Sequence, residues 1–369
     1  MRARISTFIA IVQSVLLLVH LALYGTWTFF LEPLDSFHRS ALRFALAVLS
    51  VSFVTASLLS RLYSNWVVRV VYSISAMWLG FVNFFFLAAC ACWVIYLAPA
   101  AFGIYLPRMP LGIAIFGLAL LIGAYSIINA ARTRVTRFSI KLPNLPPSWR
   151  GRTAALVSDL HLGHMRNRGF LRRIVKMLVR LQPDILFIPG DLFDGTEIDV
   201  ARLAEPWAEF SAPFGAYFVT GNHEQFSSPD QYLDAVRRSG IRVLENEKIL
   251  LDGLQIVGVH YLDSTHVDHF RSILKNANVD PGVASILLIH TPDRMPVAAE
   301  QGISLQLSGH THRGQFFPFT MIVRRIYGKF AYGLNQLENL WVYTSSGAGT
   351  WGPPMRLGTN PEIVLIRFD

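Results

Sequence analysis

Residues 153–161 read TAALVSDLH, a short apolar run that passes directly into an aspartate and a histidine. The same pattern, an apolar run followed by polar side chains, recurs four more times along the chain. It is found in DILFIPGD (184–191), AYFVTGNHE (216–224), SILLIH (285–290) and LQLSGHTH (305–312). Short apolar runs of this kind are typical of buried strands, and amphipathic segments such as RRIVKMLVRL (172–181) between them predict helices. Strands that alternate with helices predict an α/β domain whose sheets are covered by helices.

Each of these predicted strands ends at side chains that can bind a metal ion, namely Asp159, His161, Asp191, Asn222, His223, His290, His310 and His312. Ligands gather at the carboxyl ends of strands in covered sheets, so we expect these side chains at one edge. In D-x-H and H-x-H, residues i and i+2 of an extended segment would project to the same side. Two carboxylates and several imidazoles suit two divalent metals, an arrangement that suits hydrolysis of a phosphate ester.

The N-terminal third of the chain has a different composition. Before residue 135 there are only two acidic residues and nine arginines, in a chain that is 52% hydrophobic and 15% charged overall. Since a bilayer core needs about 20 apolar residues of helix, four segments are predicted to span a membrane, at residues 6–31, 41–60, 70–98 and 111–131. The sequence therefore predicts a four-helix transmembrane region (1–134) followed by a catalytic domain (135–369).

Arginines in the short connections predict the orientation in the membrane. One side carries Arg2, Arg4, Arg61, Arg69, Arg132 and Arg134, and the other carries Arg39, Arg43 and Arg108. By the positive-inside rule, both the N-terminus and the catalytic domain are expected in the cytoplasm of a multi-pass inner (plasma) membrane protein. Because the positive charge is concentrated beside the spans, no nucleic-acid partner is expected. Cys90 and Cys92 are not expected to form a disulfide.

Taken in order, DLHLG, GDLFDG, GNHE, LLIH and GHTHRGQ resemble the five sequence blocks of the calcineurin-like metallophosphoesterases. The resemblance covers roughly residues 150–369 and implies two central β-sheets flanked by helices. The sequence from GHTHRGQ onward is similar to a branch of membrane-associated phosphoesterases, some of which cleave the pyrophosphate of UDP-2,3-diacylglucosamine in lipid A assembly. Multi-span members resemble the transmembrane proteins with a metallophosphoesterase domain. The spans lie outside the core family pattern, so they carry no activity by this resemblance.

The resemblance also implies roles for individual residues. It assigns the first metal to Asp159, His161 and His312, the second to Asn222, His290 and His310, and the bridging position to Asp191. The donor types suit Mn²⁺, Fe or Zn²⁺. His223 is implied as the catalytic residue that stabilises the transition state or protonates the leaving oxygen. Asp194 is expected either to support His223 or a ligand histidine, or to cap a loop.

Four features bear on the substrate. Arg313 stands where related sequences have glycine, and it either contacts a phosphate or points to solvent. His164 either binds substrate or caps its loop. Residues 316–333 (FFPFTMIVRRIYGKFAYG) form either a lid for a lipid headgroup and acyl chains or a buried hairpin. The basic residues from Arg166 to Arg180 form either a lipid-facing surface or the solvated face of a core helix.

Three functions are consistent with these sequence features. The first is a membrane-anchored phosphodiesterase or pyrophosphatase for a lipid-linked substrate, in which the bilayer is a partner and the role lies in lipid metabolism. The second is a tethered phosphatase for soluble nucleotides or phosphoproteins. The third is a non-catalytic membrane protein that only binds a ligand, which the complete set of expected ligands disfavours. The sequence predicts no oligomeric state.

Overall fold

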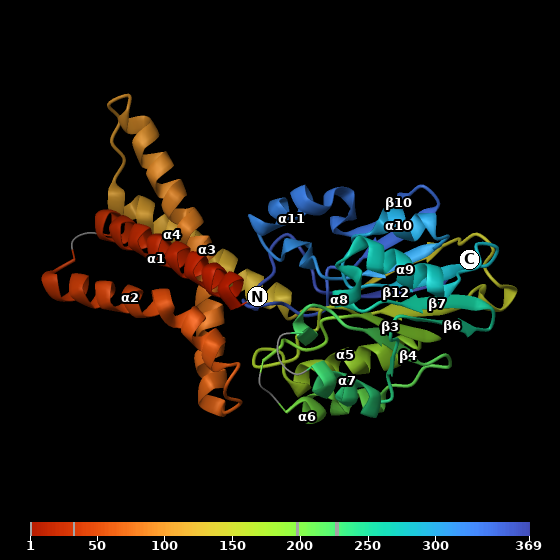
Figure 1. Ribbon diagram of the computed structural model, residues 1–369. Helices are drawn as coiled ribbons and strands as arrows, with labels where there is room; N and C mark the ends of the chain where they lie inside the picture. Colours follow the sequence, from red (N-terminus) through yellow and green to blue (C-terminus); the bar gives the residue numbers. More distant parts are fainter. Residues whose placement is uncertain (1, 32–33, 197–198, 226–228) are drawn as a thin grey trace. The chain divides into compact units, whose positions relative to one another are not determined.

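The computed structural model describes residues 2–31, 34–196, 199–225 and 229–369. The chain forms two compact units (Figure 1). The first contains the N-terminal helices up to Ile128 together with residues 352–355, and the second contains residues 129–351 and 356–369. The domain boundary at residue 135 stays a prediction.

The first unit consists of four long apolar helices, α1 (Arg2–Phe30), α2 (Ser36–Leu59), α3 (Trp66–Ala100) and α4 (Arg108–Ala130). Each is long and apolar enough to cross a membrane, as predicted. Polar side chains join α1 to α3, since the indole of Trp78 donates to Nε2 of His20 at 2.9 Å and that of Trp93 donates to Oγ1 of Thr26 at 2.9 Å. His20 is therefore an interhelical hydrogen-bond partner.

The second unit contains two six-stranded sheets. In spatial order, the first sheet consists of β1 (Arg134–Ile140), β12 (Glu362–Phe368), β2 (Thr153–Leu156), β3 (Ile185–Pro189), β4 (Ala216–Val219) and β5 (Arg242–Val243). The second consists of β10 (Gly333–Leu337), β11 (Leu340–Thr344), β9 (Leu305–Ser308), β8 (Ser285–Leu288), β7 (Leu254–Gly258) and β6 (Glu247–Leu251). Strands β2 to β5 run parallel, as do β7, β8, β9 and β11.

The two sheets pack face to face, and helices cover both outer faces (Figure 1). The inner core includes Leu156 and Phe187 of the first sheet and Ile256 and Leu288 of the second, all fully buried. The outer face of the first sheet is covered by α5 (Arg168–Leu181), α6 (Val200–Ala204) and α7 (Pro229–Arg238), and that of the second by α9 (Val267–Ala277) and α10 (Met295–Glu300). A further short helix, α8 (Tyr261–Ser264), precedes α9. The predicted α/β class is confirmed.

The segment after the fourth helix includes the Pro-rich stretch KLPNLPPSWRGR (141–152). Strand β1 pairs in parallel with β12 from the end of the chain, so the first sheet begins at Arg134. Trp149, within the Pro-rich stretch, is fully buried, and its indole donates to the carbonyl of Leu251 at 2.8 Å. This stretch is therefore part of the core.

Helix α5 is packed on the first sheet and exposes Arg173, Lys176 and Arg180, as the alternative of a core helix with a solvated face predicts. Arg166, which precedes the helix, fits neither alternative. Its guanidinium is buried and donates to Oγ1 of Thr350 at 2.9 Å. Arg168 and Arg172 pair instead with acidic residues of the neighbouring segment, Glu205 and Glu209. The apolar side of α5 supplies Leu171, Ile174, Val175 and Leu178 to the core.

The buried-hairpin alternative for residues 316–333 is wrong, because a helix forms there, and the lid alternative stays a prediction. Helix α11 spans Phe319–Tyr327 and is followed by a short 3-10 turn at Gly328–Ala331. None of the α11 side chains is buried. Several large apolar side chains are exposed along this segment, namely Phe317, Phe319, Met321, Ile322 and Ile326.

Candidate metal centre

The predicted ligand residues lie in the loops that follow strands β2, β3, β4, β8 and β9. Five of them have left-handed backbone conformations, with φ between 47° and 70°: Asp159, His161, Asp191, His310 and His312. Such conformations cost a non-glycine residue about 1–3 kcal/mol and cluster at functional sites. The chain turns sharply at these positions. The prediction that D-x-H and H-x-H lie in extended segments is therefore wrong, although their side chains still converge.

The first cluster contains Asp159, His161 and His312, whose nearest side-chain donor atoms all lie within 4.8 Å of one another. Nε2 of His161 is 2.9 Å from Nε2 of His312, which in turn is 3.6 Å from Oδ1 of Asp159. Each imidazole presents the same ring atom to a shared point. Two nitrogens and a carboxylate oxygen facing one point form a donor set that suits a divalent transition metal.

The second cluster contains Asn222, His290 and His310. Oδ1 of Asn222 lies 3.0 Å from Nε2 of His290 and 3.0 Å from Nδ1 of His310, and the two imidazole nitrogens are 3.2 Å apart. Gly221, just before Asn222, packs so tightly on Asp191 that a Cβ would overlap its carboxylate. A glycine is therefore required at this point of GNHE.

Asp191 lies between the two clusters. Its Oδ2 is 3.8 Å from Nε2 of His161 and 3.2 Å from Nε2 of His290. Its other oxygen, Oδ1, accepts from the backbone N–H of His223 at 2.9 Å. The same carboxylate oxygen therefore faces a histidine of each cluster, which is the geometry that a bridging ligand requires.

Neighbouring groups orient these imidazoles. Nδ1 of His290 donates to the carbonyl of Pro189 at 2.8 Å, which leaves the Nε2 lone pair directed into the centre. Nδ1 of His161 lies 3.2 Å from Oδ1 of Asp194 and is oriented in the same way. Nδ1 of His223 donates to the carbonyl of Asp194 at 3.1 Å. Such partners fix the tautomer of a ligand histidine and raise its basicity.

Burial and charge give these groups unequal proton affinities. Burial alone would raise the pKa of Asp191, but His290, His223 and the other imidazoles hold it well below its usual value. Burial and the neighbouring His290 lower the pKa of His310 to about 3. Because metals bind ionised carboxylates and neutral imidazoles, Asp191 and His310 both have the form that accepts a cation at neutral pH. Burial would lower the pKa of His290, but Asp191 raises it to about 9, so this imidazole would release a proton when a cation binds.

Glu224 holds the loops of the centre together, a role that the sequence did not reveal. The side chain is fully buried. Its Oε2 accepts from the backbone N–H groups of Gly221 at 2.7 Å and Asp191 at 3.0 Å, while Oε1 accepts from Phe193 at 3.0 Å. The fourth position of GNHE was the available signal, but it does not reveal which backbone groups the carboxylate reaches.

We expect Glu224→Gln to destabilise the protein by about 1–3 kcal/mol. The new amide group would put an N–H donor against a backbone N–H that accepts no hydrogen bond and that has a carboxylate oxygen as its acceptor in the wild type. The measurement is the urea midpoint of the full-length protein in detergent. Glu209→Gln is the control, since Glu209 is half exposed and its one ion pair among the described residues is with Arg172, at 3.5 Å. Equal midpoints for the two variants would contradict the role of Glu224.

The two predicted substrate-binding residues lie in different environments. His164 is buried in the loop after β2. Arg313 is exposed, and its guanidinium lies 4.4 Å above the ring of Tyr332. Arg313 also lines a cavity of about 490 Å³ beside α11.

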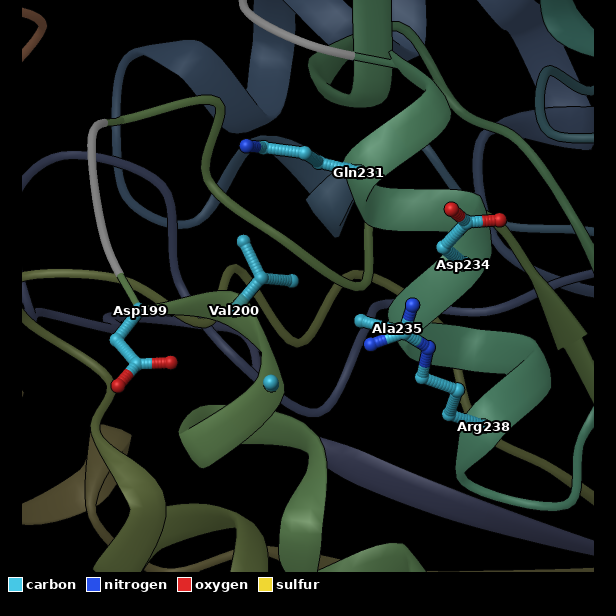
Figure 2. A pocket seen from close by; sticks show the side chains of 7 residues that line it. Asp199, Val200, Gln231, Asp234, Ala235 and Arg238 are labelled. Carbon is cyan, nitrogen blue, oxygen red and sulfur yellow. The ribbon is translucent and has the colours of Figure 1, made fainter.

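A second cavity, of about 290 Å³, lies between α6 and α7 (Figure 2). Its lining includes Asp199 and Val200 from the start of α6, and Gln231, Asp234 and Arg238 from α7. None of the residues that line it belongs to the metal clusters found among the described residues. This cavity is therefore separate from the candidate centre.

The sequence of this chain is similar to those of several known proteins. The model of the calcineurin-like phosphoesterase family matches residues 153–314. An uncharacterized metallophosphoesterase of Aquifex aeolicus is 34% identical over 258 residues, which cover 68% of this chain and 97% of the relative. A transmembrane protein with metallophosphoesterase domain of Danio rerio is 34% identical over 269 residues, which cover 68% of this chain and 61% of the relative.

A third relative, an uncharacterized metallophosphoesterase of Campylobacter jejuni, is 32% identical over 248 residues, covering 66% of this chain and 65% of the relative. The chain thus spans less than two thirds of the Campylobacter and zebrafish proteins and nearly all of the Aquifex protein. The family match includes all the loops that form the two clusters. The chain belongs to the calcineurin-like metallophosphoesterases, metal-dependent phosphoric ester hydrolases with a divalent metal centre.

Proposed function

We propose that this protein is a membrane-anchored phosphoesterase that hydrolyses a phosphodiester or pyrophosphate bond. The observation that carries the proposal is the position of Asp191 Oδ2, within 3.8 Å of a histidine from each cluster. On this proposal, Asp159, His161 and His312 hold one divalent metal, Asn222, His290 and His310 hold a second, and Asp191 bridges them. When bound, the metals neutralise phosphate charge and supply a nucleophile at neutral pH.

The side chains around the metals perform the remaining steps. His223 is anchored through Nδ1 to the carbonyl of Asp194, so its Nε2 is the ring atom available to a substrate. We assign to this atom the proton that the leaving oxygen needs. Asp194 acts as a positioning residue, because Oδ1 lies near Nδ1 of both His161 (3.2 Å) and His223 (3.6 Å).

The proposed substrate is lipid-linked, of the UDP-diacylglucosamine type. Support comes from α11, which begins seven residues after His312 and exposes Phe319, Met321, Ile322 and Ile326. Apolar side chains beside a phosphate site suit a molecule that carries both a phosphoester and hydrocarbon chains. The arginine distribution supports a cytoplasmic catalytic domain in a multi-pass plasma-membrane protein.

The test uses the purified full-length protein in detergent. Chelation should abolish hydrolysis, and addition of Mn²⁺ should restore it, because the metals supply the charge neutralisation. UDP-2,3-diacylglucosamine dispersed in detergent should be cleaved more efficiently than water-soluble bis(p-nitrophenyl) phosphate. Hydrolysis that survives complete removal of metal would contradict the metal-dependent reaction. A preference for soluble substrates would instead favour a tethered phosphatase.

A further inference from the structure

The cavity of about 490 Å³ beside α11 has a strongly positive lining. Arg313, Arg324 and Lys329 all line it, and residues 301–337 contain no aspartate or glutamate. Among the described residues, none of these three cations takes part in an ion pair. We call the cavity with these three residues the anion pocket. Its positive charge lacks a counter-ion from the chain around it.

Arg313 is held in place at the anion pocket. The Cζ atom of its guanidinium lies 4.4 Å from the centroid of the Tyr332 ring. This distance is within the range of a cation–π contact. The Tyr332 hydroxyl donates to Oε2 of buried Glu362 at 3.1 Å, and the same oxygen accepts from Thr136 of β1 at 2.6 Å. The ring is thereby anchored to the first sheet, which orders the arginine before any ligand arrives.

Lys329 is also ordered, because its ammonium group donates to the carbonyl of Gln336 at 2.8 Å. An ammonium group carries three N–H donors, so it retains donors for a ligand. Arg324, from the last turn of α11, is exposed. Three cations from three positions in the chain therefore surround one cavity, and phosphate oxygens are acceptors suited to such donors.

The anion pocket adjoins the candidate metal centre along the chain. Arg313 directly follows His312, whose Nε2 faces Asp159 at 3.6 Å, and consecutive Cα atoms are about 3.8 Å apart. A molecule whose scissile phosphate lies at the metals would therefore bring its neighbouring groups toward Arg313. Phe317 and Met321 also line the pocket, so its wall has apolar as well as basic parts.

We propose that the anion pocket binds a second phosphate group of the substrate, adjacent to the phosphate that is cleaved. This inference rests on the proposed hydrolase function and selects, from its two kinds of bond, the substrates with two linked phosphates. A lipid headgroup and a soluble nucleotide can both supply this chemistry. The Arg313 side chain is the specificity determinant, because it lines the pocket and directly follows His312 of the first cluster in the chain.

The test measures binding separately from hydrolysis in the full-length protein. Binding of inorganic pyrophosphate to metal-stripped protein is followed by calorimetry for the wild type, Arg313→Gln and the double variant Arg324→Gln/Lys329→Gln. The matched control is Arg325→Gln, which removes the same charge from the same helix outside the pocket lining. Each pocket variant should weaken binding about tenfold or more, as for loss of a charge-assisted hydrogen bond, and the control should bind as the wild type does.

Hydrolysis is then compared on three substrates with metal present: bis(p-nitrophenyl) phosphate, UDP-N-acetylglucosamine and UDP-2,3-diacylglucosamine. The pocket variants should lose about tenfold or more in kcat/KM, mainly through KM, on the two pyrophosphates and stay within about twofold on the simple diester. Loss on both pyrophosphates assigns the second phosphate irrespective of the lipid, whereas loss on the acylated one alone would contradict this assignment, because the two substrates carry the same pyrophosphate and differ in their acyl chains.

Two binding results would also overturn the anion pocket: unchanged pyrophosphate binding in both pocket variants, or an equal loss in Arg325→Gln. If the wild type hydrolyses none of the three substrates, the proposed function fails. The calorimetric measurement on metal-stripped protein still decides the pocket in that event, so the two failures are distinguishable.

Discussion

Replacing Asp191 with alanine is expected to lower hydrolysis of bis(p-nitrophenyl) phosphate by more than about a thousandfold, since two metals supply several kcal/mol of transition-state stabilisation. The physical reason is the position of Oδ2 between His161 and His290, at 3.8 Å and 3.2 Å. Without this carboxylate, the two bound cations would face each other with no negative charge between them. Elemental analysis of the purified variant should therefore find that both metals are lost together.

The control for this variant is Asp252→Ala, because Asp252 is exposed and, within the described part of the chain, forms an ion pair with Arg152 alone, at 3.3 Å. This control should retain the metal content and turnover of the wild type. A full complement of metal in Asp191→Ala would contradict the bridging role. Retention of one metal would show that the clusters bind independently, and would equally contradict it.

His223→Ala is expected to leave both metals in place and to lower kcat by about 10²–10⁴-fold on a diester with an alkyl leaving group. The backbone N–H of His223 donates to Asp191, and this bond survives the substitution. The imidazole lies edge-on to His161, with 4.5 Å between ring centroids, and on the proposed function it serves the chemistry and does not hold a metal. An aryl ester should be less affected, because its leaving group needs little protonation.

The comparison of leaving groups separates proton transfer from a merely structural effect. His269→Ala is the control, since His269 is exposed on α9 and pairs with Asp263 at 3.0 Å. Turnover of the alkyl ester within about twofold of wild type would contradict the role of His223 as an acid, since such help is worth far more. Loss of metal from His223→Ala would also contradict it.

The parts of the fold that were predictable have strong local signals. The four N-terminal helices follow from apolar runs longer than a bilayer core requires. The loops of the candidate centre follow from buried strands that end in Asp159, Asp191 and His290, because parallel strands bring their carboxyl ends to one edge within each of the two sheets. The clusters form in the structure from the residues that the motifs indicate, and their role as ligands stays a prediction.

The parts that were missed depend on partners distant in sequence. Strand β1 has a mixed polar pattern and is defined by its pairing with β12, over 220 residues later. Arg166 has the sequence context of a surface cation, and its burial depends on Thr350. Helix α11 follows a run of Phe and Pro that suggested a hairpin. Nothing local indicates that Arg313 lies against Tyr332.

Anomalous X-ray scattering from Mn²⁺-loaded crystals of the full-length protein would show whether one carboxylate joins two metal sites. We expect two anomalous peaks roughly 3.5–4 Å apart, with the Asp191 carboxylate between them. One peak should lie beside His161 and His312, and the other beside His290 and His310. A single peak, or two peaks that do not share Asp191, would show that Asp191 does not bridge two metals.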